Sequence, residues 1–71
     1  MNVEMLKYMV ELSDKETEAA DVGEFLKHYP DSDKTRRQLH DLQNGGYIAV
    51  LYAGDEIVSL MVDRAGYAYF K

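Results

Sequence analysis

The feature that most constrains the fold is the break at Asn44-Gly45-Gly46. It separates a charged segment, Thr35–Gln43, from two runs of β-branched and aromatic residues, Tyr47–Tyr52 and Ile57–Val62. Asn and Gly reach the left-handed backbone conformation that ends a helix at little steric cost. Because β-branched and aromatic residues are typical of strands, the pattern predicts a helix leading directly into a β-hairpin that turns near Gly54-Asp55.

The charged segment is expected to be a helix with a narrow apolar stripe, because only Leu39 and Leu42 are large and apolar. With Thr35 on the same inward line, a rotation of about 100° per residue places the remaining residues toward solvent. The outward arc carries Asp33, Lys34, Arg37, His40, Asp41 and Asn44, with Arg36 and Gln38 on its flanks. Any anion-binding surface is expected on this helix, although three basic residues there are equally compatible with an ordinary solvated face.

The length of the hairpin turn decides which strand residues face the core, because successive residues point to opposite faces. An even, two-residue turn at Gly54-Asp55 would place Ile57 and Met61 beside Ile48 and Val50. An odd loop would bring another set onto that face, namely Val58, Leu60 and Val62. We favour the odd loop, with Gly54 or Asp55 at positive φ, because it collects the β-branched side chains on one core face.

The odd loop leaves an apolar row on the opposite face, formed by Ala49, Leu51, Ile57 and Met61. Such a row is too apolar to face water alone, so either the N-terminal segment covers it or it serves association. Leu51, Ile57 and Met61 are therefore the candidate residues of a protein interface.

A first helix is predicted over Asn2–Ser13, with Asn2 as its N-cap. Its apolar residues recur at spacings of three and four and are Val3, Leu6, Met9 and Val10, with Met5 and Leu12 beside them. Methionines at this spacing are expected to fill the core. The polar residues Ser13–Glu16 are expected to form a loop.

A second helix is predicted to end at Tyr29-Pro30, because the residue before a proline is disfavoured in a helix. Its N-cap is Asp21, with Glu24 three residues on, and Thr17 is the alternative cap one turn earlier. Asp31-Ser32-Asp33 is expected to cap the third helix. It does not match a calcium-binding EF-hand loop, which needs Gly and Glu where Arg36 and Leu42 stand.

Asp63 is expected to cap a last short helix, Arg64–Phe70, on which Tyr67 and Phe70 lie three residues apart and can pack on one face. Stacking of Tyr67 or Tyr69 on a base is conceivable. Core packing is favoured, because few basic residues are interleaved with these rings.

Composition limits the class of protein. A chain of 71 residues without cysteine forms one domain and has neither a disulfide nor a thiolate zinc site. The net charge of −5 is uneven, since residues 1–33 carry −6 and residues 34–71 carry +1. No apolar run approaches the roughly 18 residues of a membrane span. Glu4, Lys7 and Glu11 interrupt the apolar residues at the N-terminus, so we expect no signal peptide and a cytoplasmic location.

No enzymatic chemistry is indicated. The sequence has no glycine-rich phosphate loop, and neither His28 nor His40 has a recognisable catalytic companion. We therefore expect no enzyme, no cofactor, no metal and no small-molecule substrate.

Three groups of residues together resemble a known family. They are Leu39-x-x-Leu42-x-x-x-Gly46-Tyr47-Ile48, Gly54-Asp55-Glu56-Ile57-Val58, and Val62-Asp63-x-x-Gly66-Tyr67. In this order they are similar to the small winged-helix proteins of bacteria and their phages, with Val62-Asp63 where that family usually has Leu-Thr. The resemblance implies an α+β fold over residues 1–71: a winged helix-turn-helix with a three-helix core, a C-terminal two-stranded hairpin wing and a short terminal helix.

In that family the third helix enters the DNA major groove and the wing touches the DNA backbone. Carried over, the resemblance implies contacts to double-stranded DNA from Lys34, Arg36, Arg37, Gln38 and His40. The acidic tip, Gly54-Asp55-Glu56, points the other way, because two carboxylates would be repelled by phosphate. Two hypotheses follow: a small DNA-binding transcriptional regulator, which the resemblance favours, or a protein-interaction or homodimerisation module that does not bind DNA.

Overall fold

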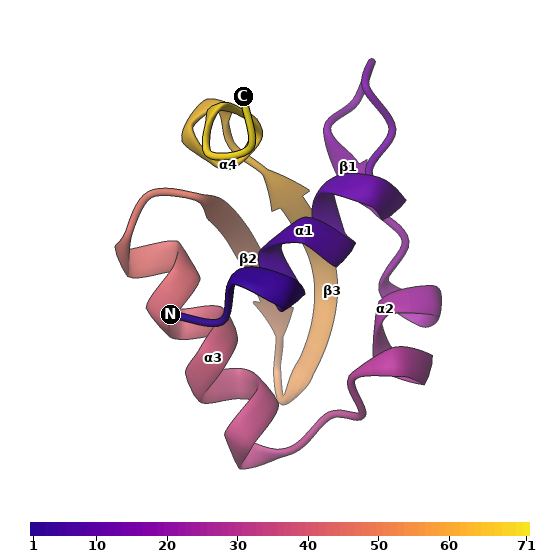
Figure 1. Ribbon diagram of the computed structural model, residues 1–71. Helices are drawn as coiled ribbons and strands as arrows, with labels where there is room; N and C mark the ends of the chain where they lie inside the picture. The colour runs from indigo at the N-terminus through magenta and orange to yellow at the C-terminus, as the bar shows by residue number, and fades with distance from the viewer.

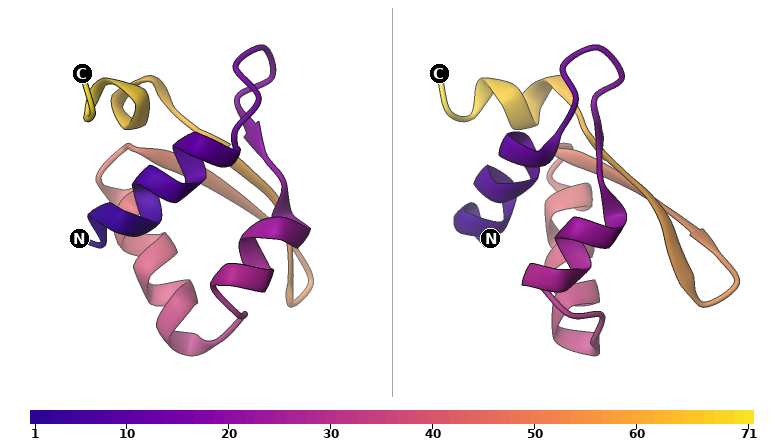
Figure 2. Two further views of the ribbon diagram at one scale, coloured as in Figure 1. Left: turned by 45° about the vertical axis from the view of Figure 1, so that its right-hand side comes forward. Right: turned by 90° about the vertical axis from the view of Figure 1, so that its right-hand side faces the viewer.

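The computed structural model describes residues 1–71 and contains four helices and one three-stranded antiparallel sheet (Figure 1). In chain order the elements are α1 (Val3–Leu12), β1 (Ala19–Ala20), α2 (Val22–His28), α3 (Asp33–Asn44), β2 (Ile48–Ala53), β3 (Glu56–Val62) and α4 (Arg64–Ala68). The strand order is β1-β3-β2. Helices α1, α2 and α3 lie on one face of the sheet, and the other face carries no helix (Figure 2). The expectation of a mixed α and β fold is confirmed, and no helix has the length and apolarity needed to cross a bilayer.

The helix starts follow their capping residues. Asn2 accepts a hydrogen bond from the Met5 amide at 2.9 Å, and Asp21 accepts one from the Glu24 amide at 3.0 Å. Because α2 begins directly after Asp21, the alternative start at Thr17 is wrong. Ser32 caps α3 by accepting from the Thr35 amide at 3.2 Å, so side-chain oxygens satisfy one otherwise unpaired donor at each of these helix ends.

The core lies between the helices and the inner face of the sheet. Its fully buried side chains are Met5, Leu6, Met9, Phe25, Leu39, Leu42, Ile48, Leu60 and Val62. The predicted role of the two methionines as core residues is confirmed, and Thr35, Leu39 and Leu42 are all buried on the inward side of α3. Helix α3 ends where expected, with Gly45 as its C-cap and Gly46 at a φ of 83°.

Strand β1 was not expected, and the two-stranded hairpin is part of a three-stranded sheet. Ala19 pairs with Met61 and Ala20 pairs with Leu60 on β3. The Val62 amide also donates to the Glu18 carbonyl at 2.9 Å. Two alanines carry little strand propensity, so this strand forms because backbone groups of β3 would otherwise lack partners.

The hairpin turn has two residues, so the odd loop is wrong. Gly54 lies at a φ of 60°, and the ladder runs Tyr52 to Ile57 and then Leu51 to Ser59. Val58 is therefore the extra residue of a β-bulge. The bulge restores Leu60 and Val62 to the core face, as expected, but it leaves Val58 51% exposed and Ile57 only 6% exposed.

Helix α4 is shorter than predicted and ends at Ala68. Asp63 occupies the N-cap position, but its side chain makes no capping hydrogen bond. The Tyr67 and Ser13 hydroxyls lie 2.7 Å apart and tie α4 to the end of α1. Phe70 stays 39% exposed and meets Tyr69 edge to face, with their ring centroids 5.1 Å apart.

Candidate functional site

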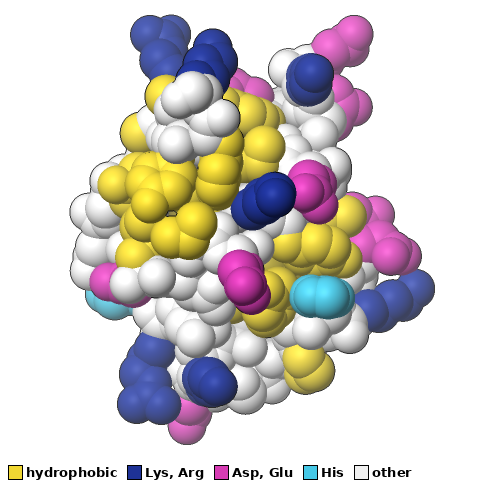
Figure 3. All heavy atoms as spheres, viewed as in Figure 1, with side chains coloured by type: hydrophobic (Ala, Val, Ile, Leu, Met, Phe, Trp, Pro, Cys, Tyr) yellow, Lys and Arg dark blue, Asp and Glu magenta, His cyan; other side chains and the backbone are white.

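Helix α3 carries all five residues implied as nucleic-acid contacts. Lys34, Arg37 and His40 are exposed, whereas Arg36 and Gln38 are partly buried on the flanks. A surface depression is lined by Asp33, Arg36, Arg37 and His40. On the side of the molecule shown in Figure 3, positive and negative side chains are dispersed, with no broad patch of one sign. The outward face of α3 is thus polar and accessible, but electrostatically mixed.

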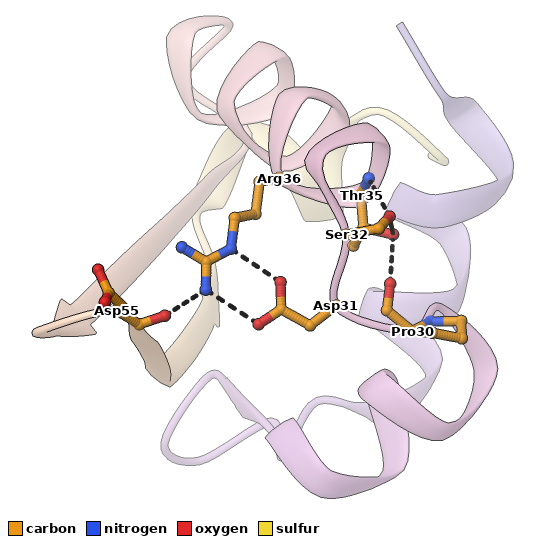
Figure 4. Close-up of polar contacts among 6 residues, drawn as sticks. All are labelled: Pro30, Asp31, Ser32, Thr35, Arg36 and Asp55. Carbon is orange, nitrogen blue, oxygen red and sulfur yellow. Dashed lines mark hydrogen bonds and ion pairs between the residues drawn. The ribbon is translucent and has the colours of Figure 1, made fainter.

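The rotation of α3 about its axis is fixed at its first turn by Thr35, which is 6% exposed. Its hydroxyl donates to the Pro30 carbonyl at 2.7 Å, and its amide donates to Ser32 (Figure 4). These bonds join the α2–α3 connection to the first turn of the helix. They direct the side of α3 opposite Thr35, Leu39 and Leu42 toward solvent.

Arg36 contacts two other segments of the chain, the α2–α3 connection and the β2–β3 hairpin. Its Nε and Nη2 atoms donate to the two carboxylate oxygens of Asp31 at 2.8 and 2.9 Å, and Nη2 also donates to the Asp55 carbonyl (Figure 4). The guanidinium carbon lies 5.5 Å from the centroid of the Tyr52 ring. The paired, parallel bonds to one carboxylate are the strongest arrangement that arginine makes with an acid.

This ion pair shifts the titration of both partners. The hydrogen bond from Arg36 lowers the pKa of Asp31, with burial opposing the shift and the positive charge adding to it. The same hydrogen bond raises the pKa of Arg36, so the guanidinium stays charged. The charge of Arg36 is therefore offset by Asp31, while Lys34 and Arg37 form no ion pair.

The Arg36 partners are functional candidates that the sequence analysis missed. Asp31 was assigned only to helix capping, and Asp55 only to an acidic turn. The spacing of five residues between Asp31 and Arg36 spans a turn rather than a helix, and the contact to Asp55 uses a backbone carbonyl. Neither relation has a sequence pattern that could have revealed it.

The outer face of the sheet holds two of the three predicted interface residues. Leu51 is 60% exposed and Met61 is partly buried, but Ile57 faces the core, so its placement in the exposed row is wrong. The residues alternating onto this face are Ala19, Ala49, Leu51, Ser59 and Met61, with the bulge residue Val58 beside them. None of them is charged, and the first charge met along the strand is Glu56 at the turn.

No family model, curated protein or solved structure significantly matches the chain. The structure also gathers no group of three or more His, Cys, Asp or Glu side chains that could hold a metal ion. What defines the molecule is its α+β architecture, a three-stranded antiparallel sheet with helices on one face. Its two candidate surfaces are the outward side of α3 and the uncharged outer side of the sheet.

Proposed function

We propose that the chain is a winged-helix DNA-binding module of the kind found in small transcriptional regulators. In this proposal α3 lies in the major groove and the β2–β3 hairpin is the wing. The observation that carries the proposal is the position of α3. Its apolar side is buried through Leu39 and Leu42, while Arg37 and His40 lie on its outward side with Gln38 on the flank. The helix leads directly into the hairpin.

Four side chains of α3 have a role in the proposal. Arg37 suits guanine or a phosphate, Gln38 suits adenine, and Lys34 near the start of the helix suits the DNA backbone. His40 is a further donor on the same side. Arg36 already binds Asp31, so we assign it no direct base contact.

Electrostatics sets the expected strength of binding. The chain has a net charge of −5, and the exposed tip residues Asp55 and Glu56 would lie near phosphates. We therefore expect weak binding that is measurable at low salt. Two modules acting together would be needed for tight binding, because one α3 makes few contacts.

The proposal is tested by titrating the protein with random-sequence duplex DNA at low salt and following amide NMR shifts. Shifts are expected at residues 34–40, and affinity should fall steeply with added salt. Arg37→Ala should weaken binding and reduce the salt slope by about one, whereas Lys15→Ala, in the turn before β1, should not. Absence of shifts at low salt, or shifts confined to other elements, would exclude the proposal.

A second candidate function, self-association, is favoured by the uncharged outer face of the sheet. Leu51 and Val58 are 60% and 51% exposed there, and no helix covers them (Figure 2). The occupant is a second copy of this chain. Two copies with a charge of −5 each repel wherever acidic side chains meet, and this face is free of charge up to the hairpin turn.

Self-association is tested by analytical ultracentrifugation. Leu51→Lys should abolish the dimer and leave a folded monomer. Ala68→Lys, at an exposed position of α4, is the matched control for the added charge and should leave the dimer intact. A wild-type protein that stays monomeric at high micromolar concentration would rule out this candidate.

A further inference from the structure

We propose that Asp31 is an internal competitor for phosphate at Arg36, and that the contact it makes is a latch between the hairpin tip and the start of α3. The latch consists of Asp31, Arg36 and the Asp55 carbonyl. The competitor part rests on the proposed DNA-binding function. The latch part does not, because it concerns the position of the hairpin in the protein alone.

The hydrogen-bonding capacity of Arg36 supports the role of Asp31 as a competitor for phosphate. A guanidinium has five N–H donors. The Nε donor and both Nη2 donors are directed at Asp31 and at the Asp55 carbonyl, which leaves only the two donors on Nη1. A phosphate would seek the same paired geometry that the Asp31 carboxylate already occupies. Binding of Arg36 to DNA therefore requires Asp31 to be displaced.

The connectivity of the three residues supports the latch. Asp31 lies in the α2–α3 connection, Arg36 lies on α3, and Asp55 lies in the turn between β2 and β3 (Figure 4). Gly54, Asp55 and Glu56 are all exposed, so the turn itself contributes nothing to the core. The guanidinium contacts the Asp55 carbonyl and lies near the Tyr52 ring, so it adds a polar connection between the turn and α3 to the core packing of Ile57.

The roles of the two acidic residues are different. Asp31 uses its carboxylate, whereas Asp55 uses its backbone carbonyl, which any residue at position 55 supplies. Asp31→Asn should therefore weaken the latch, while Asp55→Asn should preserve it. Asp33→Asn is the matched control for charge, since Asp33 lies beside Arg36 and Arg37 in the same depression but makes no bond to Arg36.

The latch is tested without DNA, by NMR measurement of amide hydrogen exchange at residues 52–57. Asp31→Asn and Arg36→Gln should each speed exchange there about tenfold relative to the core strands, because local opening of the tip becomes easier. Asp33→Asn and Asp55→Asn should match the wild type. Unchanged exchange at the tip in both Asp31→Asn and Arg36→Gln would overturn the latch.

The competitor is tested by the affinity of the same variants for random duplex DNA at low salt. Asp31→Asn should bind roughly tenfold more tightly than wild type, with a salt slope steeper by about one. Asp33→Asn should give a smaller gain in affinity, because it only removes one negative charge. The excess gain should vanish in the Asp31→Asn/Arg36→Gln double variant.

The proposed competition would be overturned if Asp31→Asn and Asp33→Asn raise the affinity for DNA equally. It would also be overturned if the excess gain in affinity persists in the Asp31→Asn/Arg36→Gln double variant. If neither the wild type nor any variant binds DNA, the DNA-binding function and the competitor fail together. The exchange measurement still decides the latch in that case, so the two failures are distinguishable.

Discussion

Thr35 is one polar side chain whose burial directs a whole helix. It stands in the first turn of α3, in line with Leu39 and Leu42, and its hydroxyl is bonded to the Pro30 carbonyl. A buried hydroxyl is stable only when it is hydrogen-bonded, so this bond fixes where the helix begins relative to the preceding turn. The exposure of Arg37 and His40 on the opposite side depends on it.

Replacing Thr35 by valine should therefore destabilise the protein although the shape is kept. The Pro30 carbonyl loses its donor, at a cost of about 1–3 kcal/mol. Thr35→Ser keeps the hydroxyl and loses only a methyl group, so it should cost about 1 kcal/mol. Urea unfolding of the three proteins measures both values, and a valine variant as stable as wild type would contradict the assignment.

Asp31 makes stability depend on pH in a defined direction. Its pKa in the folded protein lies below the ordinary value of 3.8, so the unfolded chain binds its proton more readily. The carboxylate therefore contributes its full stabilisation above the ordinary pKa and loses it as pH falls through the lower, folded value. The unfolding free energies of wild type and Asp31→Asn should differ by a constant amount between about pH 7 and pH 5.

That difference should shrink as pH falls below about 4, because the carboxyl of the unfolded chain then takes up a proton, and it should vanish only once the lower, folded pKa is passed. Urea unfolding followed by circular dichroism at several pH values measures it. A difference that is unchanged at pH 3 would mean that the ion pair with Arg36 contributes nothing to folding.

At the scale of elements, one extra residue in β3 changes which hairpin side chains face the core and which face solvent. The bulge at Val58 lets a two-residue turn coexist with buried Leu60 and Val62. It does so by moving Ile57 into the core and Val58 out of it. The same apolar residues are used as in a regular hairpin, but their exposure is exchanged at two adjacent positions.

Alanine substitutions at the two positions test this register. Ile57→Ala should cost about 2–4 kcal/mol, because it leaves a cavity beneath the hairpin. Val58→Ala should change stability by about 0.5 kcal/mol or less, as at other exposed positions. Thermal or urea unfolding gives both values, and the reverse order would indicate the register of an odd loop.

The elements divide clearly into those the sequence predicts and those it does not. The cap at Asn2, a cap within Asp31-Ser32-Asp33, the end of α3 and the buried leucines depend on local patterns and were predictable, whereas the choice of Asp21 over Thr17 was left open. The two alanines of β1 and the bulge at Val58 depend on pairing with distant backbone, which alternation of residue types does not encode. For the same reason the exposed positions of α3 were predictable, but the engagement of Arg36 with two other segments was not.

At the scale of the whole molecule, the two candidate surfaces differ in charge. The outward side of α3 mixes Lys34 and Arg37 with Asp33 and Asp41, whereas the outer face of the sheet is uncharged up to its acidic turn. The chain as a whole is acidic, with a net charge of −5. Long-range repulsion therefore opposes both DNA binding and self-association, and the two processes differ in how salt acts on them.

Salt should change the two processes in opposite directions. The proposed association with DNA through α3 would release counterions from the phosphates, so its affinity should fall as salt rises from about 20 to 200 mM. The proposed dimer through the uncharged outer sheet face would bring two acidic molecules together without ion pairs. Screening should therefore strengthen it over the same range. Sedimentation of the protein alone and fluorescence anisotropy of labelled duplex DNA measure the two trends.

Each trend should also respond to one variant only. Leu51→Lys should remove the salt-enhanced dimer and leave a DNA contact on α3 in place, because Leu51 lies on the sheet face that α3 does not cover. Arg37→Ala should weaken DNA binding and leave the dimer intact. A dimer that weakens with added salt would place ion pairs in the contact and exclude the uncharged sheet face. DNA binding that is indifferent to salt would exclude phosphate contacts by Lys34 and Arg37.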